Sequence, residues 1–198
     1  MSSSITSPTR LGFYTTALQT FTSSSPPFRI LHSIPHPASS PPKHLYILDS
    51  SFNPPTLAHL RIAQSALQED THASSQPGSK RLLLLLATQN ADKAPKPAGF
   101  EQRLVMMELF AEELLQKMRH EARRSGSPKD EREEIQGIDI AVTTKPYFVD
   151  KANAIAEEAG YTDSSTTQIR ECLPTLLLTT VIISIRHFGI YITFQTCL

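Results

Sequence analysis

The sequence predicts an α/β fold with an open, mainly parallel β-sheet. Two continuous apolar runs, residues 45–49 and 82–86, are typical of strands buried on both faces. The amphipathic stretch between them, residues 57–67, indicates a helix, and a strand–helix–strand unit gives a parallel pair with a right-handed crossover. A long helical pattern over residues 100–120 and a third apolar run over residues 138–142 continue the alternation. Together these segments favour an open α/β sheet.

The first 48 residues contain no acidic side chain and many serines and threonines. That composition fits a mitochondrial transit peptide. It also fits a helix of the domain, because Leu11, Tyr14, Leu18 and Phe21 recur at helical spacing and a short strand at residues 28–31 follows. We favour the second interpretation. Residues 34–43 are rich in proline and serine and predict a loop.

Overall composition narrows the class of protein. The chain has 198 residues and a formal net charge of zero, which argues against a non-specific nucleic-acid or membrane-surface binder. Cys172 and Cys197 have no paired spacing, which fits a reducing compartment and argues against a disulfide framework or a zinc site. We expect a cytoplasmic or nuclear protein in preference to a mitochondrial one. The oligomeric state stays open, a homo-oligomer included.

The pattern of polar and charged residues predicts the remaining connections and helices. Residues 71–79 predict a polar connector, residues 87–98 a loop and residues 151–159 a short helix. Residues 119–134 read as a charge-dense, solvated linker that begins with a basic cluster, Arg119, Arg123 and Arg124. The inner face of the long helix is expected to carry Leu104, Met106, Met107, Phe110, Leu114 and Met118.

After about residue 160 the sequence changes character. Residues 176–185 form an apolar run that is too short to span a bilayer, since Arg186 and His187 interrupt it. The run is either one extra strand or part of an altered tail. We therefore divide the chain into a lead-in over residues 1–44, an α/β domain over residues 45–170 and a divergent apolar tail over residues 171–198.

The segment with the clearest chemistry is residues 50–59, Ser-Ser-Phe-Asn-Pro-Pro-Thr-Leu-Ala-His. It joins a buried strand to a helix, so turn N–H groups and the positive end of the helix dipole point at one place. His59, one turn inside the helix, can add a hydrogen bond to an anion held there. Ligands of open α/β sheets bind beyond the carboxyl ends of the strands, where residues 50–53 and 88–93 both fall. The segment predicts a phosphate site.

This segment resembles the nucleotide-binding signature of the nucleotidylyltransferase superfamily, Gly-x-Phe-[Asp/Asn]-Pro-x-[His/Thr]-x-Gly-His. Ser50 and Ala58 stand in place of its two glycines. With residues 87–93, Ala-Thr-Gln-Asn-Ala-Asp-Lys, and residues 145–151, Lys-Pro-Tyr-Phe-Val-Asp-Lys, the chain is similar to the fungal branch of the nicotinamide-nucleotide adenylyltransferases. The resemblance covers residues 10–160 and implies the Rossmann-like fold of that superfamily.

The resemblance also implies a reaction and roles. An adenylyltransferase of this type transfers AMP from ATP to nicotinamide mononucleotide (NMN) and forms NAD and pyrophosphate, with Mg²⁺ accompanying ATP and no resident metal site. His59 would be the catalytic residue and hydrogen-bond the ATP phosphates. The backbone of Ser51 and Phe52 would contact phosphate, Thr56 would donate its hydroxyl there, and Asn53 would fix the turn and reach ribose or phosphate. The acceptor stays open, since a related enzyme would use another phosphomonoester.

Further residues complete the expected site. Lys93, on the loop after the second strand, suits an acceptor phosphate, although a solvated loop lysine is the plain alternative; Lys96 is a weaker candidate. Arg103 is expected to brace this loop. Residues 163–170 resemble the family's second signature, Ile-Ser-Ser-Thr-x-[Ile/Val]-Arg, which opens a late helix; Thr167 would cap it and Arg170 would be the transition-state cation.

One expected feature of the family is missing from the sequence. The family's Gly-x-Asp strand, which helps to hold the second substrate, is not seen after residue 160. A nucleotide-binding protein without transfer activity, or a truncated family member, is therefore the alternative to an active enzyme.

Overall fold

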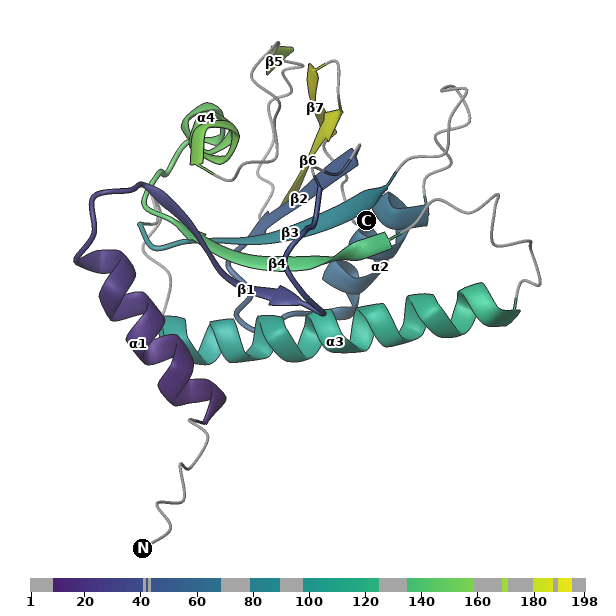
Figure 1. The fold of residues 1–198 in the computed structure, drawn as a ribbon, viewed down its shortest axis with the longest axis horizontal. Coiled ribbons are helices and arrows are strands. Elements are labelled where there is room, and N and C mark those ends of the chain that lie inside the picture. Colours follow the sequence, from purple (N-terminus) through teal and green to yellow (C-terminus); the bar gives the residue numbers. More distant parts are fainter. Residues whose placement is uncertain are drawn as a thin grey trace, which may run out of the picture.

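The computed structural model describes residues 9–40, 42, 44–68, 79–89, 98–124, 135–158, 169–170, 180–186 and 189–193, the last three ranges by backbone only. Its architecture is α/β, with one sheet between layers of helices (Figure 1). Three of the predicted connecting segments lie partly outside the described residues, namely at residues 71–78, 90–97 and 125–134.

The sheet has its parallel strands at the centre. The strand order is β1-β4-β3-β2-β6-β7-β5. β2 pairs with β3 and β3 with β4 in parallel, whereas β1 is antiparallel to β4 and β6 antiparallel to β2. The strands are β1 (Phe28–Ile34), β2 (His44–Ser50), β3 (Lys80–Ala87), β4 (Ile135–Thr143), β5 (Ile169–Arg170), β6 (Thr180–Arg186) and β7 (Gly189–Thr193). The predicted parallel arrangement is confirmed for the central strands β2, β3 and β4, whereas the flanking pairs β1–β4, β2–β6 and β6–β7 are antiparallel. Thr180–Arg186 is the extra strand that one interpretation of the apolar run expected.

Helices cover both faces of this sheet. α1 (Arg10–Thr22), α2 (Leu57–Gln68) and α3 (Phe100–Arg124) share one core with alternate strand residues, among them Tyr46, Leu48 and Leu84. α4 (Phe148–Glu158) packs on the opposite face over the intervening residues, such as Ile47 and Leu83 (Figure 1). Burial on both faces is the reason why residues 45–48 of β2 and residues 82–87 of β3 are continuously apolar.

The amino-terminal helix and strand are built into this core. Tyr14 and Phe21 of α1 are buried, and β1 pairs with β4 over its whole length. Arg10 donates to Glu112 of α3 at 2.8 Å, and Thr9 caps α1 by accepting the Gly12 N–H at 3.2 Å. The helix and strand predicted before residue 34 are confirmed.

The predicted end of the long helix is wrong. α3 continues through Arg119, Arg123 and Arg124, which the sequence analysis placed in a linker. Cations in the last turns of a helix interact favourably with its dipole, so these charges extend the helix instead of ending it. The inner face also differs at one position, because Met107 is buried whereas Met106 is only half-buried.

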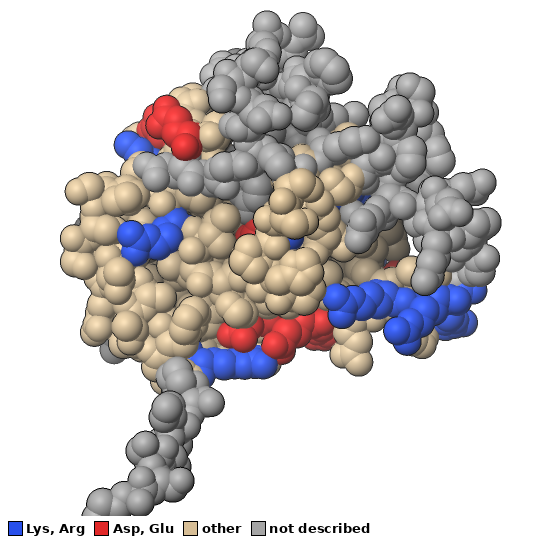
Figure 2. All heavy atoms as spheres, viewed as in Figure 1, with Lys and Arg blue, Asp and Glu red and all other residues tan. Residues whose placement is uncertain are grey.

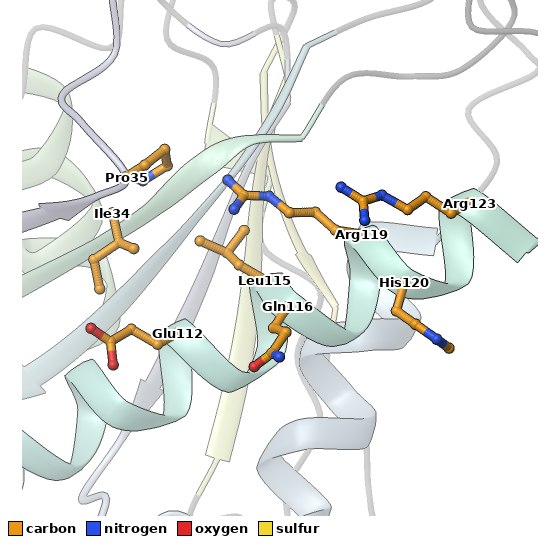
Figure 3. A pocket seen from close by; sticks show the side chains of 8 residues that line it. All are labelled: Ile34, Pro35, Glu112, Leu115, Gln116, Arg119, His120 and Arg123. Atoms are coloured by element: carbon orange, nitrogen blue, oxygen red, sulfur yellow. The ribbon is translucent and has the colours of Figure 1, made fainter.

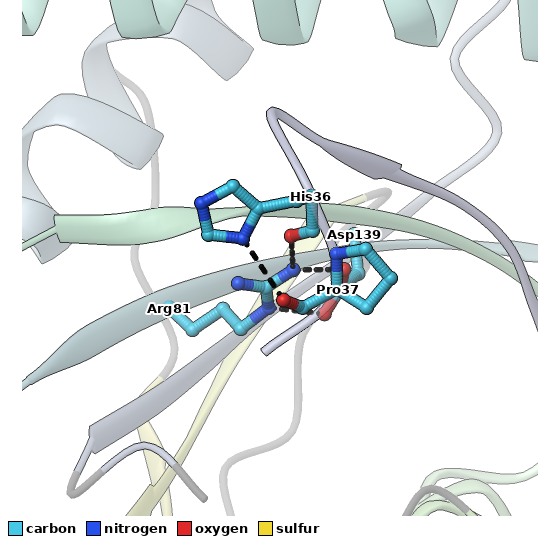
Figure 4. Close-up of polar contacts among 4 residues, drawn as sticks. All are labelled: His36, Pro37, Arg81 and Asp139. Carbon is cyan, nitrogen blue, oxygen red and sulfur yellow. Dashed lines mark hydrogen bonds and ion pairs between the residues drawn. The ribbon is translucent and has the colours of Figure 1, made fainter. Parts of the chain in front are cut away.

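One buried ion pair and several hydrogen bonds close the sheet toward the amino ends of its strands (Figure 4). Arg81 of β3 donates to both carboxylate oxygens of Asp139 on β4 at 2.5 Å and to the His36 carbonyl at 2.9 Å. Gly137 lies opposite Arg81, and a Cβ there would be 2.4 Å from the Ile34 carbonyl oxygen. Lys80 donates to the Leu67 carbonyl at 3.1 Å, near the end of α2. These contacts fix the loop after β1 and the exit of α2.

No helix in the described part of the chain combines the length and the apolar character that a membrane span requires.

Candidate functional site

The turn between β2 and α2 contains the residues of the predicted phosphate site. Phe52 adopts a φ of 44°, a left-handed conformation that is uncommon for residues other than glycine. Its side chain is fully buried, and its ring centroid lies 5.3 Å from that of His59. Such a conformation persists only where the surroundings fix it, and it occurs often at ligand sites. The packing of Phe52 therefore fixes the turn beside His59.

His59 is held by partners on both ring nitrogens. The Thr56 N–H donates to Nδ1 at 2.9 Å, and the Thr56 hydroxyl lies 2.8 Å from the same atom. Ser50 Oγ lies 2.9 Å from Nε2. Because a backbone N–H can only donate, Nδ1 is an acceptor and the ring proton is on Nε2. Burial lowers the pKa of His59, which favours this neutral form.

The other predicted residues of the turn differ in their exposure to solvent. Ser51, Asn53 and Thr56 are exposed, whereas Phe52 is buried and offers only its backbone. The Asn53 side chain accepts the Ala98 N–H at 3.1 Å, which ties the turn to the residues before α3. In this structure Thr56 contacts His59 with both its N–H and its hydroxyl, so it orients the imidazole.

Arg103 braces the two loops at this end of the sheet, as the sequence analysis expected. It is buried in the first turn of α3 and donates from Nε to the Ala98 carbonyl at 2.8 Å. Its Nη1 donates to the Ser51 carbonyl at 3.4 Å, and its guanidinium lies 5.1 Å from the Phe100 ring centroid. The start of α3 is thereby joined to the β2–α2 turn.

A buried ion pair next to the turn was missed by sequence reasoning. Lys151 Nζ of α4 lies 2.5 Å from the Asp49 carboxylate, and both side chains are 7% exposed. Burial raises the pKa of Asp49, and the Lys151 ammonium opposes that rise. The two residues are 102 positions apart, so no local pattern joins them. The available signals were a carboxylate near the end of an apolar strand and the family-like segment 145–151 that ends in Lys151, and neither one indicates the pairing.

The structure does not bring three of the predicted site residues into view at this turn, two of them because they are outside the described residues. Lys93 and Thr167, with the weaker candidate Lys96, lie outside the described residues. Arg170 lies in strand β5, so the predicted late helix is wrong at Ile169–Arg170. β5 is three positions from β2 in the sheet, roughly 14 Å at ordinary strand spacing. β5 pairs with β7, and this strand pairing replaces the helix geometry.

The described residues contain no group of three His, Cys, Asp or Glu side chains arranged to hold a metal ion. The carboxylate beside the turn, Asp49, already faces the Lys151 ammonium. The donors at the turn are N–H and O–H groups, which suit the oxygens of an anion.

Comparison with known proteins gives one informative relationship. No protein-family model matches the chain, and no solved structure matches it. The chain is similar to a protein of Schizosaccharomyces pombe named "Putative nicotinamide mononucleotide adenylyltransferase", with 34% identity over 118 residues. The matched region covers 60% of this chain and 36% of that protein, so the chain spans about a third of the length of this relative.

Proposed function

We propose that the β2–α2 turn binds the phosphates of ATP, and that the protein is a nucleotidyltransferase that transfers AMP to NMN to form NAD and pyrophosphate. The observation that carries this proposal is the neutral imidazole of His59, held with its Nε2 proton directed toward Ser50 at the carboxyl end of a central strand. The similarity to a protein named for NMN adenylyl transfer supports the choice of reaction.

The chemistry requires positioning and charge stabilisation, without a covalent enzyme intermediate. A phosphate oxygen of NMN attacks the α-phosphorus of ATP, the bond to the bridging oxygen breaks, and pyrophosphate leaves with that electron pair. His59 would exchange its Ser50 contact for a phosphate oxygen and donate its Nε2 proton as a hydrogen bond. Thr56 would hold the ring through Nδ1 during this exchange. Because the ring is already oriented, little reorganisation is needed.

Backbone donors at the turn would supply further contacts. Ser51 is exposed next to the fixed Phe52, so the amides there are candidates to meet phosphate oxygens, as at other strand-to-helix turns. Lys93 remains our proposed cation for the acceptor phosphate, and Thr167 remains a proposal from the second signature. Mg²⁺ would arrive as MgATP, since this ion keeps water and substrate phosphates as most of its ligands.

A second function is favoured by one specific observation. The matched region covers only 36% of the S. pombe relative, so parts of that protein have no counterpart in the alignment. A chain that retains the turn but lacks the remaining substrate contacts would bind nucleotide without transferring AMP.

One assay separates these functions. The full chain is incubated with ATP, Mg²⁺ and NMN, and NAD and pyrophosphate are both quantified. We expect equal amounts of the two products, and a loss in kcat of about 10²–10³ in His59→Ala, the usual effect of removing one transition-state donor. His36→Ala is the matched control, because that imidazole is exposed and lies 3.0 Å from the Pro37 carbonyl oxygen, outside the β2–α2 turn. MgATP binding without either product would favour the second function, and absence of binding would contradict both.

A further inference from the structure

A cavity lies far from the β2–α2 turn, between α3 and the end of β1 (Figure 3). Its volume is about 360 Å³, within the usual range of about 300–1,000 Å³ for small-molecule sites. Ile34, Pro35 and Leu115 give it an apolar wall, and Arg119 and Arg123 line it with cations. Arg103 at the start of α3 and Arg119 are 16 positions apart, about 24 Å along the helix, so this cavity is separate from the turn.

Arg119 and Arg123 both line this cavity. They are four residues apart on α3, so they are neighbours on one helix face. Figure 3 shows both side chains extending from the same side of the helix, with Arg119 nearest to Leu115 and Pro35. Two guanidinium groups one helical turn apart can bracket a single anion.

Positive charge is in excess around this cavity. Glu112 also lines it, but its carboxylate accepts from Arg10 at 2.8 Å. No carboxylate of the described residues lies within ion-pair distance of Arg119 or Arg123. Figure 2 shows a patch of basic side chains at the end of α3, next to a patch of acidic side chains. Within the described part of the chain, no carboxylate therefore competes with a ligand for these two arginines.

We propose that this cavity binds a small phosphomonoester whose organic group is flat and apolar, with Arg119 and Arg123 on the phosphate. A phosphate dianion matches two guanidinium groups in charge and in paired N–H geometry. The wall of Ile34, Pro35 and Leu115 then contacts the ring. The helix dipole explains why cations gather at the end of α3, but it does not explain an apolar cavity beside two of them.

Phenyl phosphate is the probe for this site. The full chain is titrated with it by calorimetry at fixed ionic strength, together with the exposed variants Arg123→Gln and Arg124→Gln. Both variants remove one charge at the same helix end, but only Arg123 lines the cavity. We expect saturable one-to-one binding, a rise in Kd of about tenfold in Arg123→Gln from the loss of a charge-assisted hydrogen bond, and less than about twofold in Arg124→Gln.

Two further arms test the position and the chemistry. His59→Ala should leave the phenyl phosphate Kd unchanged, because His59 belongs to the other site. Inorganic phosphate should bind more weakly than phenyl phosphate, since it makes no contact with the apolar wall. Equal losses of phenyl phosphate affinity in Arg123→Gln and Arg124→Gln would show that binding depends only on the general positive charge of this helix end. That result would overturn the proposal. Loss of binding in His59→Ala, or no saturable binding at all, would also overturn it.

Discussion

The two ends of the central strands use polar side chains in opposite ways. At the amino ends, Arg81, Asp139 and Lys80 are buried and directed at partners inside the protein. At the carboxyl ends, His59 is half-buried and lies in a turn whose residues Ser51, Asn53 and Thr56 are exposed. The first arrangement closes the sheet, whereas the second keeps hydrogen-bond donors next to solvent. Polar groups alone therefore do not mark a site; their accessibility does.

The same contrast separates the two buried ion pairs. Arg81 and Asp139 meet through two hydrogen bonds, with side chains 0% and 2% exposed. Asp49 and Lys151 meet through one hydrogen bond at the carboxyl end, and both side chains are 7% exposed. Removing one partner of a buried ion pair leaves the other charge buried and poorly solvated. The loss of unfolding free energy should therefore be larger for the more deeply buried pair.

The largest expected effect is at the amino ends. Asp139→Asn should lower the free energy of unfolding by about 3–5 kcal/mol, because it leaves the Arg81 guanidinium buried without its carboxylate. Urea unfolding at pH 7 measures the loss. The double variant Arg81→Met/Asp139→Leu should recover much of it, since both charges are then absent. A loss below about 1 kcal/mol in Asp139→Asn would mean that the two ends do not differ as described.

A smaller effect is expected at the Asp49–Lys151 pair. Lys151→Met should cost about 1.5–3 kcal/mol, the range for a hydrogen bond to a charged group. Asp49 can respond by taking a proton, because burial raises its pKa, so the cost should decrease at acid pH. Lys117→Met is the control: that lysine is exposed on α3 and should change stability by less than about 0.5 kcal/mol. Equal losses for the two lysine variants would contradict a special role for the buried pair.

Ser50→Ala should lower the free energy of unfolding by a still smaller amount. The variant removes the partner of His59 Nε2 and should cost about 0.5–1.5 kcal/mol, the net value of one hydrogen bond. Thermal unfolding compared with Ser65→Ala, on the exposed face of α2, isolates this contact. If the two serine variants unfold alike, Ser50 does not hold the ring.

The smallest effect is a pH dependence from His59. Burial places its folded pKa below the ordinary value of about 6.5, so between these two values the unfolded chain binds more protons than the folded protein. Stability from this residue is therefore complete above about pH 6.5 and is lost as the pH falls toward the folded pKa. The difference in unfolding free energy between about pH 7.5 and pH 5.5 should be smaller in His59→Ala than in the unaltered protein. An identical difference would show that His59 is not held neutral.

Local patterns predicted most of the fold near the site. Continuous apolarity identified β2 and β3, and helical spacing identified α1, α2 and most of α3. Both signals come from residues that are close in sequence, so they can be detected in a single sequence. The charged end of α3 misled the same reasoning, because Arg119 to Arg124 suit both a linker and the carboxyl end of a helix.

The site was predicted only where its residues are close in sequence. Ser50, Thr56 and His59 lie within ten residues, and the structure brings them together around one imidazole. Contacts between distant residues were out of reach: Asp49 meets Lys151 across 102 positions and Arg81 meets Asp139 across 58. Tertiary packing makes these pairs, and no local spacing encodes them.

The most direct test of the central claim follows the seven histidines of the chain during a titration with MgATP. In protein labelled with ¹⁵N at histidine, we expect His59 to show the Nε2-protonated neutral ring before ligand is added. Its Nε2 signal should then shift saturably with MgATP, while His36, at the opposite end of the sheet, stays unchanged. A His59 signal that does not move while ATP binds elsewhere, or an unbound ring protonated on Nδ1, would contradict the account.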